Sequence, residues 1–167
     1  MIRRTLLSLP IATAILALGG CAYKQPLLFK RSGRFSLVTT STSGEREAVN
    51  GRFSLYRTSD SLHLDLMTPL NGILASIEVT PSGAVLTTAQ DDAPVTASNA
   101  EELIRLTAGV TVPIEALERW LTMTGDRASE FGWLIRVLNR RADGTPGTIR
   151  ASTTSPTISL TLKLDED

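Results

Sequence analysis

The sequence predicts a mainly β domain, an incomplete antiparallel β-barrel covered by a lid of two short helices. Beyond residue 32, most apolar residues alternate with polar ones, which is the pattern of strands with one buried face. Two short segments in the middle of the chain instead place apolar residues at helical spacing. Because strands flank these helices, the helices must bury their apolar faces against the sheet. A two-sheet sandwich with the helices outside is the alternative architecture.

The N-terminal residues have the features of a bacterial lipoprotein signal. Arg3 and Arg4 precede an apolar stretch from Leu6 to Leu18, which is too short to span a bilayer as a helix. The stretch ends in Leu18-Gly19-Gly20-Cys21, which resembles a lipobox. Small residues there let a peptidase approach the backbone, and only a thiol can form the thioether to a diacylglycerol. The alternatives are an ordinary secretory signal with a chance cysteine, or a reactive free thiol.

These features divide the chain into three parts. We expect residues 1–20 to be cleaved, Cys21 to be lipidated, residues 21–31 to form a tether and residues 32–167 to form a single domain. In lipoproteins of bacteria with two membranes, an Asp after the cysteine typically marks retention in the inner membrane. Ala22 occupies that position here, so the resemblance implies an outer-membrane destination with the protein facing the periplasm.

The alternating segments are separated by residues that favour turns. Asn50-Gly51 ends a polar stretch that begins at Thr39, Pro81-Ser82-Gly83 follows the fourth segment, and Asp143-Gly144 comes late in the chain. Between these turns we expect seven or eight strands. They are centred on Phe35–Leu37, Phe53–Leu55, Leu62–Leu66, Ile73–Val79, Ala84–Thr88, Trp133–Val137, Ile149 and Ile158–Leu164.

The helical interlude has clear start and stop signals. Ser98-Asn99-Ala100-Glu101 has the form of a capping box, and Gly109 is placed to end this first helix. Pro113 opens the second helix, where its missing N–H costs little, and Gly125 ends it. One face of each helix is apolar; the residues are Leu103, Ile104 and Leu106 in the first and Ile114, Leu117, Trp120 and Leu121 in the second.

Charge and composition exclude several classes of function. The chain has 17 Lys and Arg residues and 17 Asp and Glu residues without a basic cluster in the sequence, so nucleic acid is not an expected partner. The only histidine, His63, precedes Asp65 by two positions, but no nucleophile motif accompanies the pair. Asp91-Asp92 and the tail Asp165-Glu166-Asp167 lack further spaced ligands. We expect no enzymatic activity, no cofactor and no metal, and we expect a monomer.

A turn between two of the strands carries an apolar residue. In Thr68-Pro69-Leu70-Asn71-Gly72, Pro69 presets a turn and Asn71-Gly72 tolerates positive φ, which predicts a tight hairpin. If Leu70 is exposed at the tip, it is a candidate contact with a membrane or a protein partner. The alternative is that Leu70 folds back over the edge of the sheet.

Several motifs in this order resemble the LolB family of proteins, which insert lipoproteins into the outer membrane. The most specific is the run Gly-x-x-x-Pro-Ile-x-x-Leu-x-x-Trp-Leu from Gly109 to Leu121. The remaining motifs are Cys21, Gly33-Arg34-Phe35-Ser36-Leu37, Leu66-Met67-Thr68-Pro69-Leu70-Asn71-Gly72, Ala100-Glu101-Glu102-Leu103, Gly132-Trp133, Pro146 and Leu160-Thr161-Leu162-Lys163-Leu164. The chain departs from the family at Asn71, which interrupts the usual Pro-Leu-Gly. It also has Leu55-Tyr56 where a tryptophan is common, and an acidic tail where another tryptophan usually follows the last strand.

The resemblance implies a function for the apolar face of the sheet. It implies a half-open barrel whose cavity accepts the acyl chains of lipoproteins from a periplasmic carrier similar to LolA and passes them to outer-membrane lipids. By the same resemblance, Pro69, Leu70, Asn71 and Gly72 form the membrane-insertion loop. The alternative is a scaffold lipoprotein with a packed core that binds an envelope protein. The residues expected to line the cavity are Phe35, Leu37, Phe53, Leu55, Leu62, Leu64, Ile77, Leu117, Trp120, Trp133 and Ile135.

Overall fold

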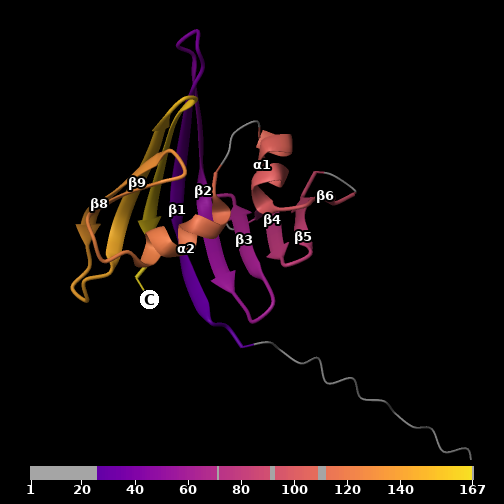
Figure 1. Ribbon diagram of the computed structural model, residues 1–167, viewed down its shortest axis with the longest axis horizontal. Coiled ribbons are helices and arrows are strands. Elements are labelled where there is room, and N and C mark those ends of the chain that lie inside the picture. The colour runs from indigo at the N-terminus through magenta and orange to yellow at the C-terminus, as the bar shows by residue number, and fades with distance from the viewer. Residues whose placement is uncertain (1–25, 71, 91–92, 109–111, 167) are drawn as a thin grey trace, which may run out of the picture.

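A computed structural model describes residues 26–70, 72–90, 93–108 and 112–166 of the chain. Ten strands form one antiparallel sheet in the order β6-β5-β4-β3-β2-β1-β10-β9-β8-β7 (Figure 1). Because β6 and β7 do not pair with each other, the sheet stays open, which confirms an incomplete barrel and rules out the two-sheet sandwich. Cys21, Asn71, the Asp91-Asp92 pair and Gly109 lie outside the described residues.

The strands are longer and more numerous than the alternation alone predicted. Two short strands, β6 and β7, were not predicted, because three or four residues contain too few alternations to be recognised. The strands are β1 (Phe29–Thr40), β2 (Arg46–Arg57), β3 (Leu62–Met67), β4 (Ile73–Thr80), β5 (Gly83–Thr88), β6 (Val95–Ala97), β7 (Arg127–Glu130), β8 (Trp133–Arg140), β9 (Pro146–Thr154) and β10 (Thr157–Leu164).

The predicted turn at Asn50-Gly51 is wrong, because both residues lie within β2. The chain turns instead near Gly44, whose φ of 86° is the left-handed conformation that glycine favours. Gly51 serves a different purpose, since a Cβ atom there would lie 2.8 Å from Cε1 of Phe35 and 2.5 Å from the carbonyl oxygen of Met67. The absence of a side chain therefore makes room for the Phe35 ring.

The first strand begins at Phe29, which is before the domain boundary expected at residue 32. Phe29, Lys30 and Arg31 pair with Arg57, Tyr56 and Leu55 of β2, respectively. These pairings place residues 29–31 in the sheet, so the tether can include only residues before Phe29.

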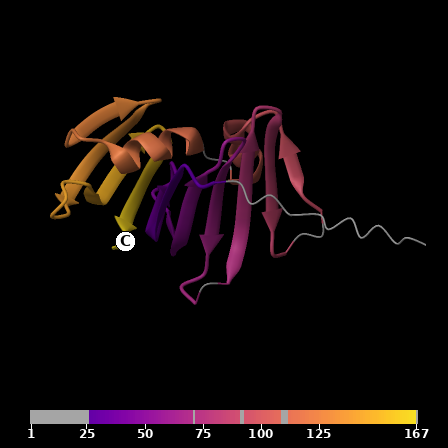
Figure 2. The ribbon, with the colours of Figure 1, turned by 90° about the horizontal axis from the view of Figure 1, so that it is seen from below.

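Helices α1 (Ala100–Ala108) and α2 (Ile114–Thr122) lie on the same, concave face of the sheet, as Figure 2 shows. Helix α1 contacts β5 and β6, and helix α2 contacts β9. The predicted capping box between Ser98 and Glu101 is wrong, because Asn99 and Glu102 make the capping hydrogen bonds. Oδ1 of Asn99 accepts the backbone N–H of Glu102 at 2.9 Å, and the Glu102 carboxylate accepts the backbone N–H of Ser98 at 3.1 Å. Pro113 directly precedes α2 as predicted, but the helix ends at Thr122, before Gly125.

The core lies between the concave face of the sheet and the two helices. Alternate residues of nearly every long strand point into it, together with Leu103 of α1 and Ile114, Leu117, Trp120 and Leu121 of α2. All five of these helical residues are at most 5% exposed. At the edge of this layer, the Arg57 guanidinium of β2 binds the Glu118 carboxylate of α2 at 2.6 Å.

Candidate functional site

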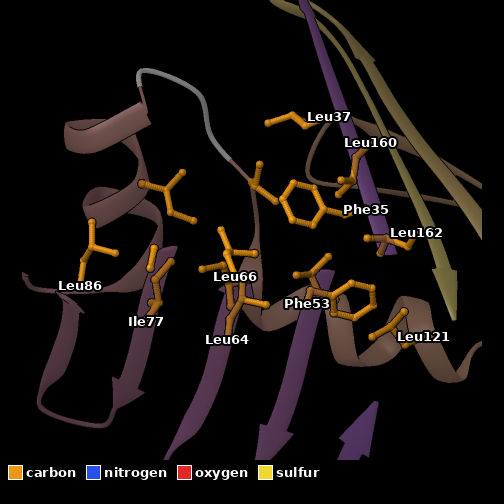
Figure 3. A pocket seen from close by; sticks show the side chains of 15 residues that line it. Phe35, Leu37, Phe53, Leu64, Leu66, Ile77, Leu86, Leu121, Leu160 and Leu162 are labelled. Carbon is orange, nitrogen blue, oxygen red and sulfur yellow. The ribbon is translucent and has the colours of Figure 1, made fainter. Parts of the chain in front are cut away.

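An apolar cavity of about 270 Å³ lies between the concave face of the sheet and the helices (Figure 3). This volume is close to the lower end of the range for ligand pockets, roughly 300–1,000 Å³. Its side chains come from six strands, from both helices and from the residue before Pro113, and all are hydrocarbon. They are Phe35, Leu37, Phe53, Leu64, Leu66, Ala75, Ile77, Leu86, Ile104, Val112, Ile114, Leu117, Leu121, Leu160 and Leu162.

The structure places six of the eleven expected residues around this cavity: Phe35, Leu37, Phe53, Leu64, Ile77 and Leu117. The other five, Leu55, Leu62, Trp120, Trp133 and Ile135, do not line it but are buried in the surrounding core. Alternation identifies the buried face of a strand correctly, but not the part of that face that the helices leave uncovered. Helical spacing pointed to Ile114 and Leu121 as buried, and both face the cavity.

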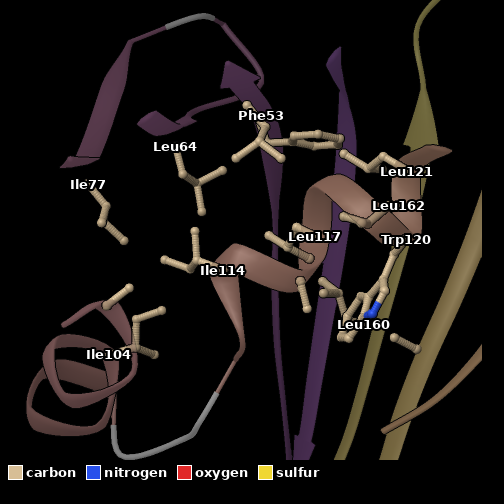
Figure 4. Packing of buried hydrophobic residues seen from close by; sticks show 14 of the residues in the cluster. Phe53, Leu64, Ile77, Ile104, Ile114, Leu117, Trp120, Leu121, Leu160 and Leu162 are labelled. Atoms are coloured by element: carbon tan, nitrogen blue, oxygen red, sulfur yellow. The ribbon is translucent and has the colours of Figure 1, made fainter. Parts of the chain in front are cut away.

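Trp120 lies on α2 beside the cavity instead of within its wall. Figure 4 shows its ring near Leu160, apart from Leu64 and Ile77. Nε1 of Trp120 donates a hydrogen bond to the Glu130 carboxylate at 3.0 Å, and the ring centroid is 5.8 Å from that of Trp133. Hydrogen bonds from Arg119, and then from Trp120, lower the pKa of Glu130 below its usual value. These contacts join α2 to β7 and β8.

One end of the cavity is accessible from solvent. Phe35, Leu37, Leu66 and Ala75 line it but are only partly buried, whereas Ile114, another lining residue, is fully buried. Leu66 and Ala75 belong to the ends of β3 and β4 that are joined by the short hairpin containing Leu70. The accessible part of the cavity is therefore close to the base of this hairpin.

The hairpin between β3 and β4 presents an exposed leucine. The Thr68 N–H donates to the Gly72 carbonyl at 2.8 Å, and the Gly72 N–H donates to Oγ1 of Thr68 at 3.0 Å. Leu70 is 93% exposed, so it does not fold back over the sheet. Ile73 and Leu74 follow it with 60% and 39% exposure. Figure 2 shows the hairpin extending from the sheet on the side away from the helices.

His63 and Asp65 do not form a couple in the described part of the chain. Nε2 of His63 lies 2.6 Å from Oγ of Ser61, and its ring stacks on Tyr56 with centroids 4.6 Å apart. Asp65 instead accepts a hydrogen bond from Ser76 at 2.5 Å. Among the described residues, no group of His, Cys, Asp and Glu side chains is placed to hold a metal ion. Neither α1 nor α2 has the length and apolar character that a membrane-spanning helix needs.

Comparisons with known proteins point to one family. The family model described as "Outer membrane lipoprotein LolB" matches residues 28–155. The chain is 37% identical over 93 residues to the outer-membrane lipoprotein LolB of Bordetella petrii, covering 56% of this chain and 46% of that protein. It is 31% identical over 121 residues to the protein of the same name from Cupriavidus metallidurans, covering 72% of this chain and 56% of that protein. The chain thus spans about half the length of the curated relatives it matches.

Proposed function

This chain belongs to the LolB family of outer-membrane lipoproteins, and we propose that it inserts other lipoproteins into the outer membrane. In this proposal the protein is anchored by lipid to the outer membrane and faces the periplasm. It accepts the acyl chains of a lipoprotein from a soluble periplasmic carrier similar to LolA. It then releases them into the inner leaflet of the same membrane.

The observation that carries the proposal is the open, entirely apolar cavity. Acyl chains need hydrocarbon contacts and no hydrogen-bonding groups, and every residue that lines the cavity is apolar. Such contacts are weakly directional, so an acyl chain can leave without an energy source. Transfer requires only that the bilayer bind the chain better than the cavity does. The alternative, a scaffold lipoprotein, would have a packed core, so the cavity favours lipoprotein insertion over that alternative.

The anchor proposed at Cys21 fits this function. A single acyl chain binds a bilayer only marginally, whereas the two or three chains of a lipoprotein cysteine attach it stably, at about 0.8 kcal/mol for each buried methylene. Residues 21–28 can extend to roughly 26–29 Å. Strand β3, from its start to the hairpin, covers roughly 20 Å. The tether can therefore span a distance similar to the length of β3.

The hairpin is the part of the protein that we propose meets the bilayer during release. Leu70 is almost fully exposed, and it lies just beyond the strand ends at which the cavity is accessible. Contact between Leu70 and the bilayer would bring the cavity opening close to the membrane surface. We propose that Pro69 and Gly72 shape this loop, together with Asn71 at the position between Leu70 and Gly72.

Filling part of the cavity should weaken cargo binding. Ala75→Phe adds a phenyl group to the cavity wall, and we expect the affinity for a synthetic triacylated lipopeptide to fall at least about tenfold. Overpacking a filled core costs about 1–3 kcal/mol, but empty space next to Ala75 should keep the loss of stability below that range. Native mass spectrometry of the unlipidated mature chain with the lipopeptide measures binding, and thermal unfolding measures stability.

The matched control is Ala48→Phe, which makes the same change at an exposed position on β2. This variant should bind the lipopeptide as the unmodified chain does. Equal binding by all three proteins would show that the cavity is not the site of the acyl chains, and it would favour the scaffold function.

A further inference from the structure

The outer, convex face of the sheet carries cations that strand pairing brings side by side. Arg136 of β8 pairs with Arg127 of β7 on one side and with Arg150 of β9 on the other. Arg34 of β1 pairs with Arg52 of β2 and with Lys163 of β10. Arg136, Arg150 and Lys163 alternate with side chains that point into the core. We call this set the basic band; it comprises Arg34, Arg52, Arg127, Arg136, Arg150 and Lys163, and it crosses six neighbouring strands.

This arrangement is unfavourable for the sheet itself. Side chains that are directly opposite have Cβ atoms roughly 4.5–5.5 Å apart, and like charges at that separation destabilise the pairing. Among the six residues of the basic band, only Arg52 has an acidic partner in the described part of the chain, Asp165 at 2.5 Å. The other five residues of the band are exposed. Their side chains make no ion pair or hydrogen bond with any residue that the structure describes. Three arginines outside the basic band do have carboxylate partners: Arg57 binds Glu118, Arg119 binds Glu130 and Arg140 binds Asp126.

The basic band adjoins the exposed hairpin. Arg34, Arg52 and Lys163 surround a surface hollow of about 450 Å³, and Pro69 of the hairpin forms part of the same hollow. Leu70, the next residue, is 93% exposed, and Figure 2 shows the hairpin on the side of the sheet away from the helices. An exposed apolar tip beside a row of cations matches a membrane surface, where phosphate groups lie just outside the acyl chains.

We propose that the basic band is a docking surface for the anionic phospholipid headgroups of the bilayer into which the protein delivers its cargo. Phosphates would neutralise the opposed arginines, and the hollow beside Pro69 would hold the headgroup next to the inserted Leu70. The proposal rests on the proposed function for the contact of Leu70 with the bilayer, but it does not depend on what the cavity holds. An acidic protein surface could also match this charge, but it would not need an exposed leucine beside the cations.

The test measures vesicle binding by the mature chain carrying Cys21→Ala, which has no lipid anchor and keeps every strand and helix described above. Circular dichroism first establishes that each variant is folded. Co-sedimentation is then compared for vesicles of phosphatidylcholine alone and vesicles that contain phosphatidylglycerol. We expect binding to the anionic vesicles that weakens with added salt, since screening shortens the reach of each charge.

Two variants with the same loss of charge then locate the binding surface. A basic residue near an anionic surface contributes about fivefold to binding, so Arg136→Gln with Arg150→Gln should weaken binding about 25-fold. Arg46→Gln with Arg105→Gln removes two exposed arginines outside the basic band and should change binding little. Arg136→Lys with Arg150→Lys should restore binding, because headgroups respond to charge more than to the shape of the guanidinium.

Three results would overturn the proposal. One is equal binding to neutral and anionic vesicles, and another is equal binding by the two glutamine variants. The third is loss of carrier binding with unchanged vesicle binding in the Arg136→Gln, Arg150→Gln variant, which would assign the basic band to an acidic protein. With any of these three results, the cavity would still bind the lipopeptide. Failure of the proposed function would instead appear as absent lipopeptide binding with normal vesicle binding.

Discussion

Replacing Trp120 by alanine should lower the free energy of unfolding by about 3–5 kcal/mol, the range for truncating a buried tryptophan. The side chain is 2% exposed and packs against Trp133. Its Nε1 donates to Glu130, so the truncation also removes a hydrogen bond that joins α2 to β7. Urea denaturation measures the loss as a lower transition midpoint with an unchanged slope.

The same position distinguishes a core helix from a movable lid. Trp120→Phe keeps an aromatic ring and loses the hydrogen bond, so it should cost clearly less than the alanine variant. Because Trp120 is not part of the cavity wall, lipopeptide affinity in Trp120→Phe should stay near its original value. If Trp120→Ala left stability almost unchanged and reduced lipopeptide binding, Trp120 would be a lid residue that faces the cargo.

Leu70→Glu should slow release of cargo into liposomes while leaving cargo binding unchanged. Transfer of one leucine from water into the membrane contributes about 1.5–3 kcal/mol, which corresponds to roughly a 10- to 150-fold change in rate if it is realised during release. A carboxylate at the same position also resists transfer out of water. Folding should be unaffected, because the side chain is 93% exposed. The assay follows uptake from the carrier and insertion into liposomes with the same preparation.

Leu106→Glu is the matched control, because Leu106 is also an exposed apolar residue but lies on α1, outside the β3–β4 hairpin and outside the cavity wall. It should insert cargo at the original rate. Normal insertion by Leu70→Glu, or lost uptake with normal insertion, would show that the role proposed for Leu70 is misplaced.

Much of the fold could be predicted from local patterns in the sequence. The alternation at Leu62, Leu64 and Leu66 identified β3 and its buried face, and the spacing from Ile114 to Leu121 identified α2. The turn predicted at Asn50-Gly51 was wrong because this dipeptide is common in turns. Here Gly51 instead makes room for the ring of Phe35, a residue of the neighbouring strand. A contact between strands cannot be seen in a single strand's pattern.

For the candidate sites too, features set by neighbouring residues could be predicted, whereas features set by contacts between distant segments could not. The position of Leu70 at a tight turn could be predicted from the sequence. Whether its side chain is exposed or folds back over the edge of the sheet could not. The cavity wall depends on which part of the concave face the helices cover, and Trp133 and Ile135 therefore lie outside it although they are buried. The basic band is dispersed from Arg34 to Lys163 and appears only when the pairing of β1, β10, β9 and β8 is known.

The central claim is that the apolar cavity holds the acyl chains of cargo, and cross-linking tests it directly. A triacylated lipopeptide with a photoreactive diazirine near the end of one acyl chain would be bound to the unlipidated mature chain and irradiated. Peptide mapping should locate the cross-links at cavity residues such as Phe35, Leu64 and Leu117, and Ala75→Phe should abolish them. Cross-links confined to the Leu70 hairpin or the convex face, unchanged in Ala75→Phe, would contradict the claim.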